Sequence, residues 1–186
     1  MPSGQMTRPS RIDFMALILI QETGAGLANA NSYASVTDGN AYHDGHLYAT
    51  AWTVATDAQK AAALVMASRL IDAEFQFNGT RTNVVQGLQW PRRQCRIPDQ
   101  EGELAADAVP KALALATCEM ARELLIADRT TAPAGEGLKY YNNAGVQTGY
   151  DKTDRRPVLS QVTQVMLAKY GSQISASSGA VRLTRV

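Results

Sequence analysis

Apolar residues recur every three or four positions in several stretches between residues 35 and 171, and this spacing predicts amphipathic helices. One stretch follows Thr56, which together with Gln59 three residues later has the form of a capping box. From there one face is formed by Ala61, Leu64, Val65, Ser68, Ile71 and Phe75. The sequence therefore predicts a helix that begins after Thr56 and ends before Gly79.

A second stretch, from Pro110 to about Asp128, has the widest apolar face in the chain. Pro110 suits the first turn of a helix, where the missing N–H is not needed. The apolar stripe is formed by Leu113, Thr117, Met120 and Leu124, and it is widened by Leu115, Ala116, Ala121 and Leu125. Because so wide a face must be covered on several sides, we expect this helix at the centre of the fold.

Two shorter helices complete the pattern. Thr37 is a suitable N-cap for a helix that ends near Tyr48, and Trp52 just beyond it is a large anchor for the core. Pro157 opens the last helix and Gly171 closes it. We expect the core to contain Leu64, Ile71, Leu113, Met120 and Leu124, packed against Trp52.

The segments outside these helices are long, and their compositions differ. Residues 1–14 are rich in Pro, Ser and Gly, residues 16–20 form a candidate short strand, and residues 78–108 are irregular. Residues 131–156 indicate an extended loop or a hairpin with residues 142–145 at its turn. At the end, residues 181–186 alternate as a strand does, and such a strand needs a sheet edge, including one on another subunit.

Together these patterns predict a mainly α fold, a small bundle of about four helices with minor β structure. The predicted units are an N-terminal arm with a short strand (1–34), a helical core (35–130), an extended loop or hairpin (131–156), a C-terminal helix (157–171) and a C-terminal docking arm (172–186).

Composition and charge limit the function. The chain has 186 residues, with 18 Lys and Arg against 17 Asp and Glu and a net charge of +1. This balance argues against bulk binding to nucleic acid or to a membrane surface. The longest apolar run, residues 15–20, is far shorter than the roughly 20 residues that span a bilayer. Two cysteines are too few for a disulfide framework, so we expect reduced thiols in a protein made in the cytoplasm.

Signals for catalysis or cofactor binding are weak. Gly24 and Gly26 follow an apolar run but lack the third glycine and the βαβ context of a dinucleotide site, so a plain turn is favoured. His43 and His46 could begin a zinc site, but no third ligand follows, and surface polarity is the better interpretation. Glu119 and Glu123, with Arg122 between them, indicate a solvated or interface face rather than a catalytic carboxylate pair. We therefore expect no enzyme activity, no cofactor and no metal.

The candidate interface residues lie in three places. Four arginines without any acid occur around a tryptophan: Arg81, Trp90, Arg92, Arg93 and Arg96. This combination suits single-stranded DNA, through stacking and phosphate contacts, and it equally suits a protein interface. The balanced overall charge favours the protein interface. The other candidates are Tyr140 and Tyr141 in the long loop, and Val181, Arg182, Leu183 and Arg185 near the end of the chain.

Four motifs in order resemble one family. They are the run Glu22-Thr23-Gly24-Ala25-Gly26-Leu27-Ala28-Asn29-Ala30-Asn31-Ser32-Tyr33, then Arg69-Leu70-Ile71-Asp72 with Gly79-Thr80-Arg81, then Leu88-Gln89-Trp90-Pro91-Arg92, and finally Val109-Pro110 before an Ala-rich helix. Over about residues 16–130 the chain resembles a family common in tailed-phage genomes, often labelled DnaT-like single-stranded DNA-binding proteins.

The resemblance implies a structural virion protein, a head-to-tail connector located between the portal and the tail. It implies a homo-oligomeric ring of about twelve subunits, built on repeated heterologous contacts. The implied partners are the portal protein and tail or nozzle proteins, with DNA passing through the ring without sequence-specific binding. The alternative is a single-stranded DNA-binding accessory protein.

Overall fold

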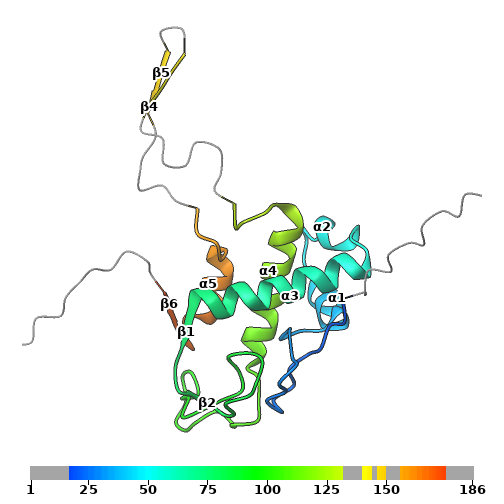
Figure 1. The fold of residues 1–186 in the computed structure, drawn as a ribbon, viewed down its shortest axis with the longest axis vertical. Helices are drawn as coiled ribbons and strands as arrows, with labels where there is room; N and C mark the ends of the chain where they lie inside the picture. Colours follow the sequence, from blue (N-terminus) through cyan, green and yellow to red (C-terminus); the bar gives the residue numbers. More distant parts are fainter. Residues whose placement is uncertain (1–16, 132–139, 144–145, 150–155, 175–186) are drawn as a thin grey trace, which may run out of the picture.

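The computed structural model describes residues 17–131, 140–143, 146–149 and 156–174, and it is mainly α with minor β structure, as predicted (Figure 1). Its described helices are α1 (Val36–Asp44), α2 (Thr50–Thr53), α3 (Asp57–Glu74), α4 (Lys111–Ile126) and α5 (Gln161–Leu167). Its described strands are β1 (Phe75–Phe77), β2 (Thr80–Arg81), β3 (Arg92–Arg93), β4 (Tyr140–Asn143), β5 (Val146–Gly149) and β6 (Gly171–Gln173). They form three two-stranded antiparallel sheets, β1–β6, β2–β3 and β4–β5.

The longest helix, α3, begins where the sequence predicts. The Thr56 hydroxyl accepts the Gln59 N–H, and the Gln59 side chain accepts the Thr56 N–H, which completes the capping box. The predicted face is buried at Leu64, Val65 and Ile71. The helix passes directly into β1 at Phe75, whose ring belongs to the core.

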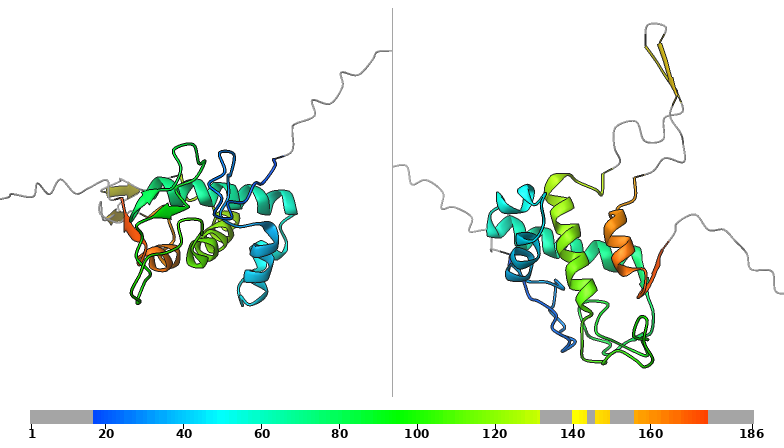
Figure 2. Two further views of the ribbon diagram at one scale, coloured as in Figure 1. Left: turned by 90° about the horizontal axis from the view of Figure 1, so that it is seen from below. Right: turned by 180° about the vertical axis from the view of Figure 1, so that it is seen from behind.

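The central helix is α4, also as predicted. It starts immediately after Pro110, and it packs against α3 on one side and against α5 and α1 elsewhere. Figure 2 shows this as two layers, with α3 in one and α4 and α5 in the other. Leu64, Ile71, Leu113, Met120 and Trp52 are buried, as predicted, whereas Leu124 is half-buried at the edge of the core.

The first helix differs from the prediction at both ends. Its N-cap is Ser35, not Thr37, because Ser35 and Asp38 form a reciprocal capping box. The helix ends at Asp44, short of Tyr48, and the separate short helix α2 carries Trp52 into the core. The Trp52 ring packs directly against the backbone of α1 at Gly39. Only glycine permits this contact, because a Cβ at this position would lie 2.3 Å from the ring.

His43 was predicted at the surface, and this is wrong. It is buried with its ring 4.8 Å from that of Trp52, and its Nε2 lies 3.1 Å from the Cys118 carbonyl oxygen. Burial lowers the pKa of His43, so the ring is neutral at pH 7. It therefore serves as a core side chain that joins α1 to α4.

The predicted strand at residues 16–20 is also wrong over residues 17–20, which form no strand. Asn31 holds this segment instead: its Oδ1 accepts the Ile20 N–H at 2.8 Å, and its Nδ2 donates to the Ile18 carbonyl at 2.9 Å. The only bridge nearby in the described part of the chain joins Gln21 to Ser32. Side-chain hydrogen bonds replace the expected ladder here.

The last helix is shorter than predicted. It begins after Ser160, whose hydroxyl accepts the Thr163 N–H, and not at Pro157. Gly171 does not close it but opens β6, where a Cβ would lie 2.2 Å from the Gln76 carbonyl oxygen. Glycine is needed at this position for the close approach of β6 to β1.

The burial pattern predicts unequal costs along α4. Leu113→Ala should lower the free energy of unfolding by about 2–5 kcal/mol, because it leaves a cavity among fully buried neighbours. Leu124→Ala should cost less, since its side chain is half-buried. Ile126→Ala, at an exposed position of the same helix, is the control and should change stability by less than about 0.5 kcal/mol. Urea unfolding followed by circular dichroism measures all three, and equal losses for Leu113→Ala and Ile126→Ala would contradict the assignment.

Candidate interface around the arginine loop

The loop from residue 78 to 108 does not present its arginines and tryptophan as one surface. Arg81, Arg93 and Arg96 are exposed, but Trp90 is 0% exposed and Arg92 only 5%. The predicted set is therefore divided between the surface and the interior. Tyr140 and Tyr141 lie in β4, but their side chains are outside the described part, as are Val181, Arg182, Leu183 and Arg185.

Arg92 holds the loop together. Its Nε donates to the Asn78 carbonyl at 2.8 Å, and its Nη2 donates to the Gly79 carbonyl at 2.7 Å. Further bonds reach the Phe77 carbonyl and both the backbone and side-chain oxygens of Gln89. Burial lowers the pKa of Arg92, yet the guanidinium stays charged and its donors are all directed inward. The prediction that Arg92 belongs to an interface is wrong. Its guanidinium is buried, because the backbone carbonyls of this irregular loop need its N–H donors as hydrogen-bond partners.

Trp90 is a core residue and not a stacking platform. Its ring meets Phe77 and Tyr170 edge to face, with centroids 5.9 Å and 6.3 Å away. The peptide bond to Pro91 is cis. Because the ring is fully enclosed, no base can stack on it in this fold. The prediction that Trp90 forms an interface is therefore also wrong.

The partly buried carboxylate of Asp72 joins the loop to two other parts of the chain. The Tyr33 hydroxyl donates to Asp72 Oδ1 at 2.5 Å, and the Gln89 N–H donates to Asp72 Oδ2 at 3.0 Å. The same Gln89 N–H also lies 3.0 Å from the Tyr33 oxygen. Burial raises the pKa of Asp72 to about 6, and burial beside this carboxyl raises that of Tyr33. The N-terminal segment, α3 and the loop thus meet at one point.

The glycine-rich segment after Glu22 is a folded turn. The buried Glu22 carboxylate accepts the N–H groups of Gly24, Gly26 and Leu27 at 2.8–2.9 Å. Gly24 has a φ of +114°, and a Cβ there would lie 1.8 Å from the Asp107 carbonyl oxygen. The plain turn that the sequence favoured is therefore correct, and the turn packs against the segment that leads into α4.

Of the two alternatives predicted for the acidic residues of α4, a solvated face or an interface face, the solvated face is wrong for Glu119. Glu119 is buried and pairs with Arg122 at 2.6 Å, while His46 lies 3.8 Å away. Arg122 also pairs with Glu123. The hydrogen bond to Glu119, and to a smaller extent that to Glu123, raises the pKa of the guanidinium. Glu123 in turn pairs with Arg129 at 3.2 Å. The ion pairs form a chain that runs to the end of α4.

Arg129 closes the base of the excursion between α4 and α5. Its Nε donates to the Val158 carbonyl at 2.9 Å and its Nη2 to the Pro157 carbonyl at 3.0 Å. From the other side, Arg156 donates to the Asp128 carbonyl at 2.7 Å. The chain therefore leaves the helical body and returns to it at one place. Sequence reasoning missed this clamp, because its partners are 28 or 29 residues apart and share no periodic pattern.

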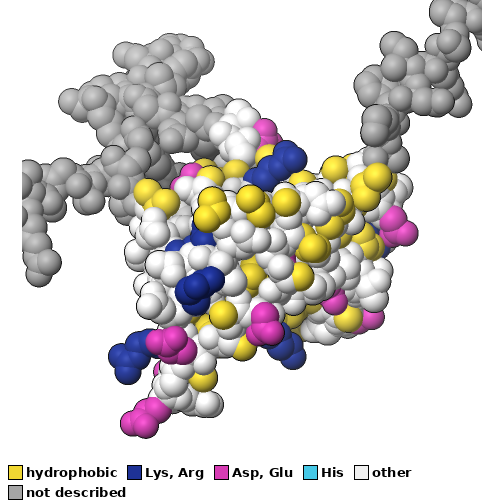
Figure 3. Space-filling model, turned by 60° about the horizontal axis from the view of Figure 1, so that its bottom comes forward, with side chains coloured by type: hydrophobic (Ala, Val, Ile, Leu, Met, Phe, Trp, Pro, Cys, Tyr) yellow, Lys and Arg dark blue, Asp and Glu magenta, His cyan; other side chains and the backbone are white. Residues whose placement is uncertain are grey.

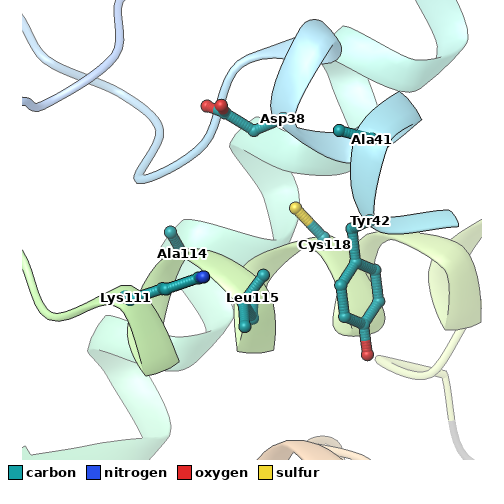
Figure 4. Close-up of a pocket in the computed structure, with 7 residues that line it drawn as sticks. All are labelled: Asp38, Ala41, Tyr42, Lys111, Ala114, Leu115 and Cys118. Carbon is teal, nitrogen blue, oxygen red and sulfur yellow. The ribbon is translucent and has the colours of Figure 1, made fainter. Parts of the chain in front are cut away.

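A groove of about 460 Å³ lies between α1 and α4 (Figure 4). Asp38 and Lys111 stand at its edges, and Tyr42, Leu115 and Cys118 line it together with small side chains. Burial raises the pKa of the Cys118 thiol to about 12, so it stays protonated and is a poor nucleophile. No group of three metal-ligating side chains occurs in the described residues.

The exposed charges are mixed. On the face drawn in Figure 3, basic and acidic side chains alternate instead of forming one basic patch. Arg81 and Arg93 are further engaged with the carbonyls of Gln86 and Thr82. This surface has no continuous track for a phosphate backbone.

A family model described as "Putative DnaT-like ssDNA binding protein" matches residues 15–186. The chain belongs to this family. The match confirms the family part of the resemblance and extends it beyond residue 130, and it does not bear on a connector role. A search of curated proteins and a search of solved structures each gave no match. Among the helices that the structure describes, none has the length and apolar character to cross a membrane.

In this family member the two neighbouring arginines should behave differently. Arg92→Ala should lower the free energy of unfolding by about 2–4 kcal/mol, because several buried carbonyls lose a charged donor. Arg93→Ala, the matched control one residue later, should change it by less than about 0.5 kcal/mol. Denaturant unfolding of both variants measures this difference. If Arg92→Ala were as stable as Arg93→Ala, the role of Arg92 within the fold would be refuted.

Proposed function

We propose that this chain is a structural subunit that works by assembly, as a head-to-tail connector between the portal and the tail of a tailed phage. The observation that carries the proposal is the clamp at Arg129. The helical body holds the base of an excursion whose hairpin, β4–β5, pairs with no other strand in the described part of the chain. Figure 1 draws this hairpin away from the helices. Such an element gains little within its own subunit, so its stabilising contacts belong to a partner.

Two exposed apolar clusters also support assembly. Leu17 and Met66 are exposed, and both line a hollow of about 450 Å³ at α3; Ile18, next to Leu17 in the chain, is exposed as well. Val162 and Val165 are exposed on α5, in the other layer. A ring needs two different surfaces that meet between successive copies. In this proposal the chain has no catalytic role and needs no cofactor, and its place is the head–tail interface of the virion.

Excision of the excursion tests the proposal. Replacing residues 132–155 by a short Gly/Ser linker should leave stability within about 1 kcal/mol, because a shorter loop costs slightly less to close. The same variant should fail to join heads to tails and should fail to form portal-bound rings in electron micrographs. The control is an equal replacement that keeps the excursion length with a Gly/Ser sequence, which should also fail if the hairpin itself makes the contacts. Normal joining by both variants would overturn the proposal.

A second candidate function is binding of single-stranded DNA, and the family description favours it. The exposed side chains of Arg81, Arg93 and Arg96 are the residues available for phosphate contacts. Trp90 and Arg92 are not available, so binding would be electrostatic and without base stacking. Affinity of that kind falls steeply as salt rises.

Fluorescence anisotropy with a labelled oligonucleotide distinguishes the two candidates. For a connector we expect no measurable affinity at physiological salt, both for the wild type and for Arg93→Ala with Arg96→Ala. Micromolar binding that this double change abolishes, with stability unchanged, would establish the DNA-binding function instead. Arg69→Ala with Lys111→Ala, which removes two exposed positive charges on α3 and α4, serves as the charge-matched control.

A further inference from the structure

The β1–β6 sheet has one closed edge and one open edge. On the closed edge, the Phe77 carbonyl accepts a hydrogen bond from Arg92, and the Phe75 N–H donates to the Ile71 carbonyl of α3. Phe75 and Phe77, the two residues of β1 whose backbone groups point away from β6, thus each have a hydrogen-bond partner on this edge. The open edge is that of β6, which lies at the margin of the molecule beside α5 (Figure 1).

The hydrogen-bond pattern shows which groups of β6 are free. Ile174 donates to the Glu74 carbonyl at 2.8 Å, and the Tyr170 carbonyl accepts from Asn78 at 2.9 Å. Backbone groups alternate in direction along a strand, so Gly171 and Gln173 point their N–H and C=O groups away from β1. Within the described residues these groups have no hydrogen-bond partner. An unpaired edge of this kind is a template for another strand.

A slot runs along this edge. It has a volume of about 250 Å³ and is lined by Phe75, Gln164, Val165, Ala168, Gly171, Ser172 and Gln173. The side chains that line the slot are uncharged. Val165 in its lining is 68% exposed, and Ile174, which follows β6, is 49% exposed, so apolar surface is accessible at the slot. The slot thus offers backbone hydrogen bonds on one side and apolar contacts on the other, which is what an added strand requires.

We propose that the open edge of β6 accepts residues 181–186 of a second copy of this chain as an added strand. This inference rests on the proposed function, since a ring places a neighbouring copy within reach at high effective concentration. Residues 181–186 lie outside the described residues, and Val181 to Thr184 alternate between apolar and polar as a strand does. In an extended strand Val181 and Leu183 fall on one face, which suits Val165 and Ala168, and Arg182 falls on the other face, away from the uncharged slot. Arg185 follows on the first face, beyond this apolar pair.

The donor strand and the acceptor slot are different surfaces. A contact in which each copy gives residues 181–186 to the next is heterologous, and repetition of such a contact closes a ring when the rotation between successive copies divides a full turn. Pairing of residues 181–186 with β6 is therefore a heterologous contact, which is the type that the proposed ring needs.

Intermolecular disulfides between full-length chains test the proposal. Val165→Cys and Leu183→Cys are made in separate chains, mixed and oxidised; the native Cys95 and Cys118 are buried free thiols and do not compete. We expect a disulfide-linked dimer of the two variants. The control is Val84→Cys mixed with Leu183→Cys, because Val84 is 91% exposed but lies in the arginine loop. This control should give far less dimer.

Proline substitutions test the edge itself. Gln173→Pro removes an N–H that points away from β1, so the subunit should stay folded while the cross-link to Leu183→Cys is lost. Ser172→Pro removes an N–H directed at β1, so it should destabilise the sheet itself. If Gln173→Pro left the cross-link unchanged, the edge-strand contact would be overturned.

The remaining outcomes are also decisive. Rings seen by electron microscopy without the Val165–Leu183 cross-link would overturn this contact and leave the connector proposal standing. A chain carrying both Val165→Cys and Leu183→Cys that links only to itself at every concentration would show that residues 181–186 dock on their own subunit, and the exchange would be refuted. Cross-linked dimers without portal-bound rings would support the strand contact and count against the connector.

Discussion

The irregular half of this protein depends on the carboxylate of Asp72. It projects from α3 and accepts hydrogen bonds from the Tyr33 hydroxyl and from the backbone of Gln89, so one side chain joins the N-terminal segment, the longest helix and the arginine loop. The desolvation that raises its pKa is offset in part by these donors and by the nearby guanidinium groups of Arg81 and Arg92, and the pKa stays raised, at about 6. The N-terminal segment and the arginine loop have little regular secondary structure, so hydrogen bonds of this kind fix their conformation against α3.

The same chemistry recurs wherever the chain is neither helix nor strand. Arg92 donates hydrogen bonds to the carbonyls of residues 77–79, and Glu22 accepts hydrogen bonds from three N–H groups. Arg129 donates to the carbonyls at the base of the excursion. Each case follows from the cost of a buried backbone group without a partner. A charged side chain with several donors or acceptors satisfies many such groups from one position. This explains why a protein with balanced charge uses its charges inside as well as outside.

These internal roles change how the family motifs are understood. Tyr33, Asp72, Gln89, Trp90 and Arg92 come from three separate motifs. Tyr33, Trp90 and Arg92 are buried, and Asp72 and Gln89 are half-buried and hydrogen-bonded to them. These motif residues thus form part of the scaffold. We propose the surfaces for partners elsewhere, on the outer faces of α3 and α5, along the edge of β6 and on the hairpin β4–β5. An assembling subunit fits this distribution, because its scaffold and its contacts are formed by different parts of the chain.

The sequence by itself determined the helices whose signals are local. The capping box at Thr56, the proline before α4 and the apolar stripes depend on residues within a turn or two of each other, so α3, α4 and their buried faces could be predicted from spacing alone. Tertiary structure decided the remainder. Trp90 and Arg92 looked like surface residues because tryptophan and arginine are common at interfaces. Contacts with Phe77, Asn78 and Tyr170, which lie far away along the chain, enclose them. Gly171 had the form of a helix end, but its role is set by the approach of β1 nearly a hundred residues earlier. Long-range packing leaves no periodic mark in the sequence, and for that reason it could not be predicted.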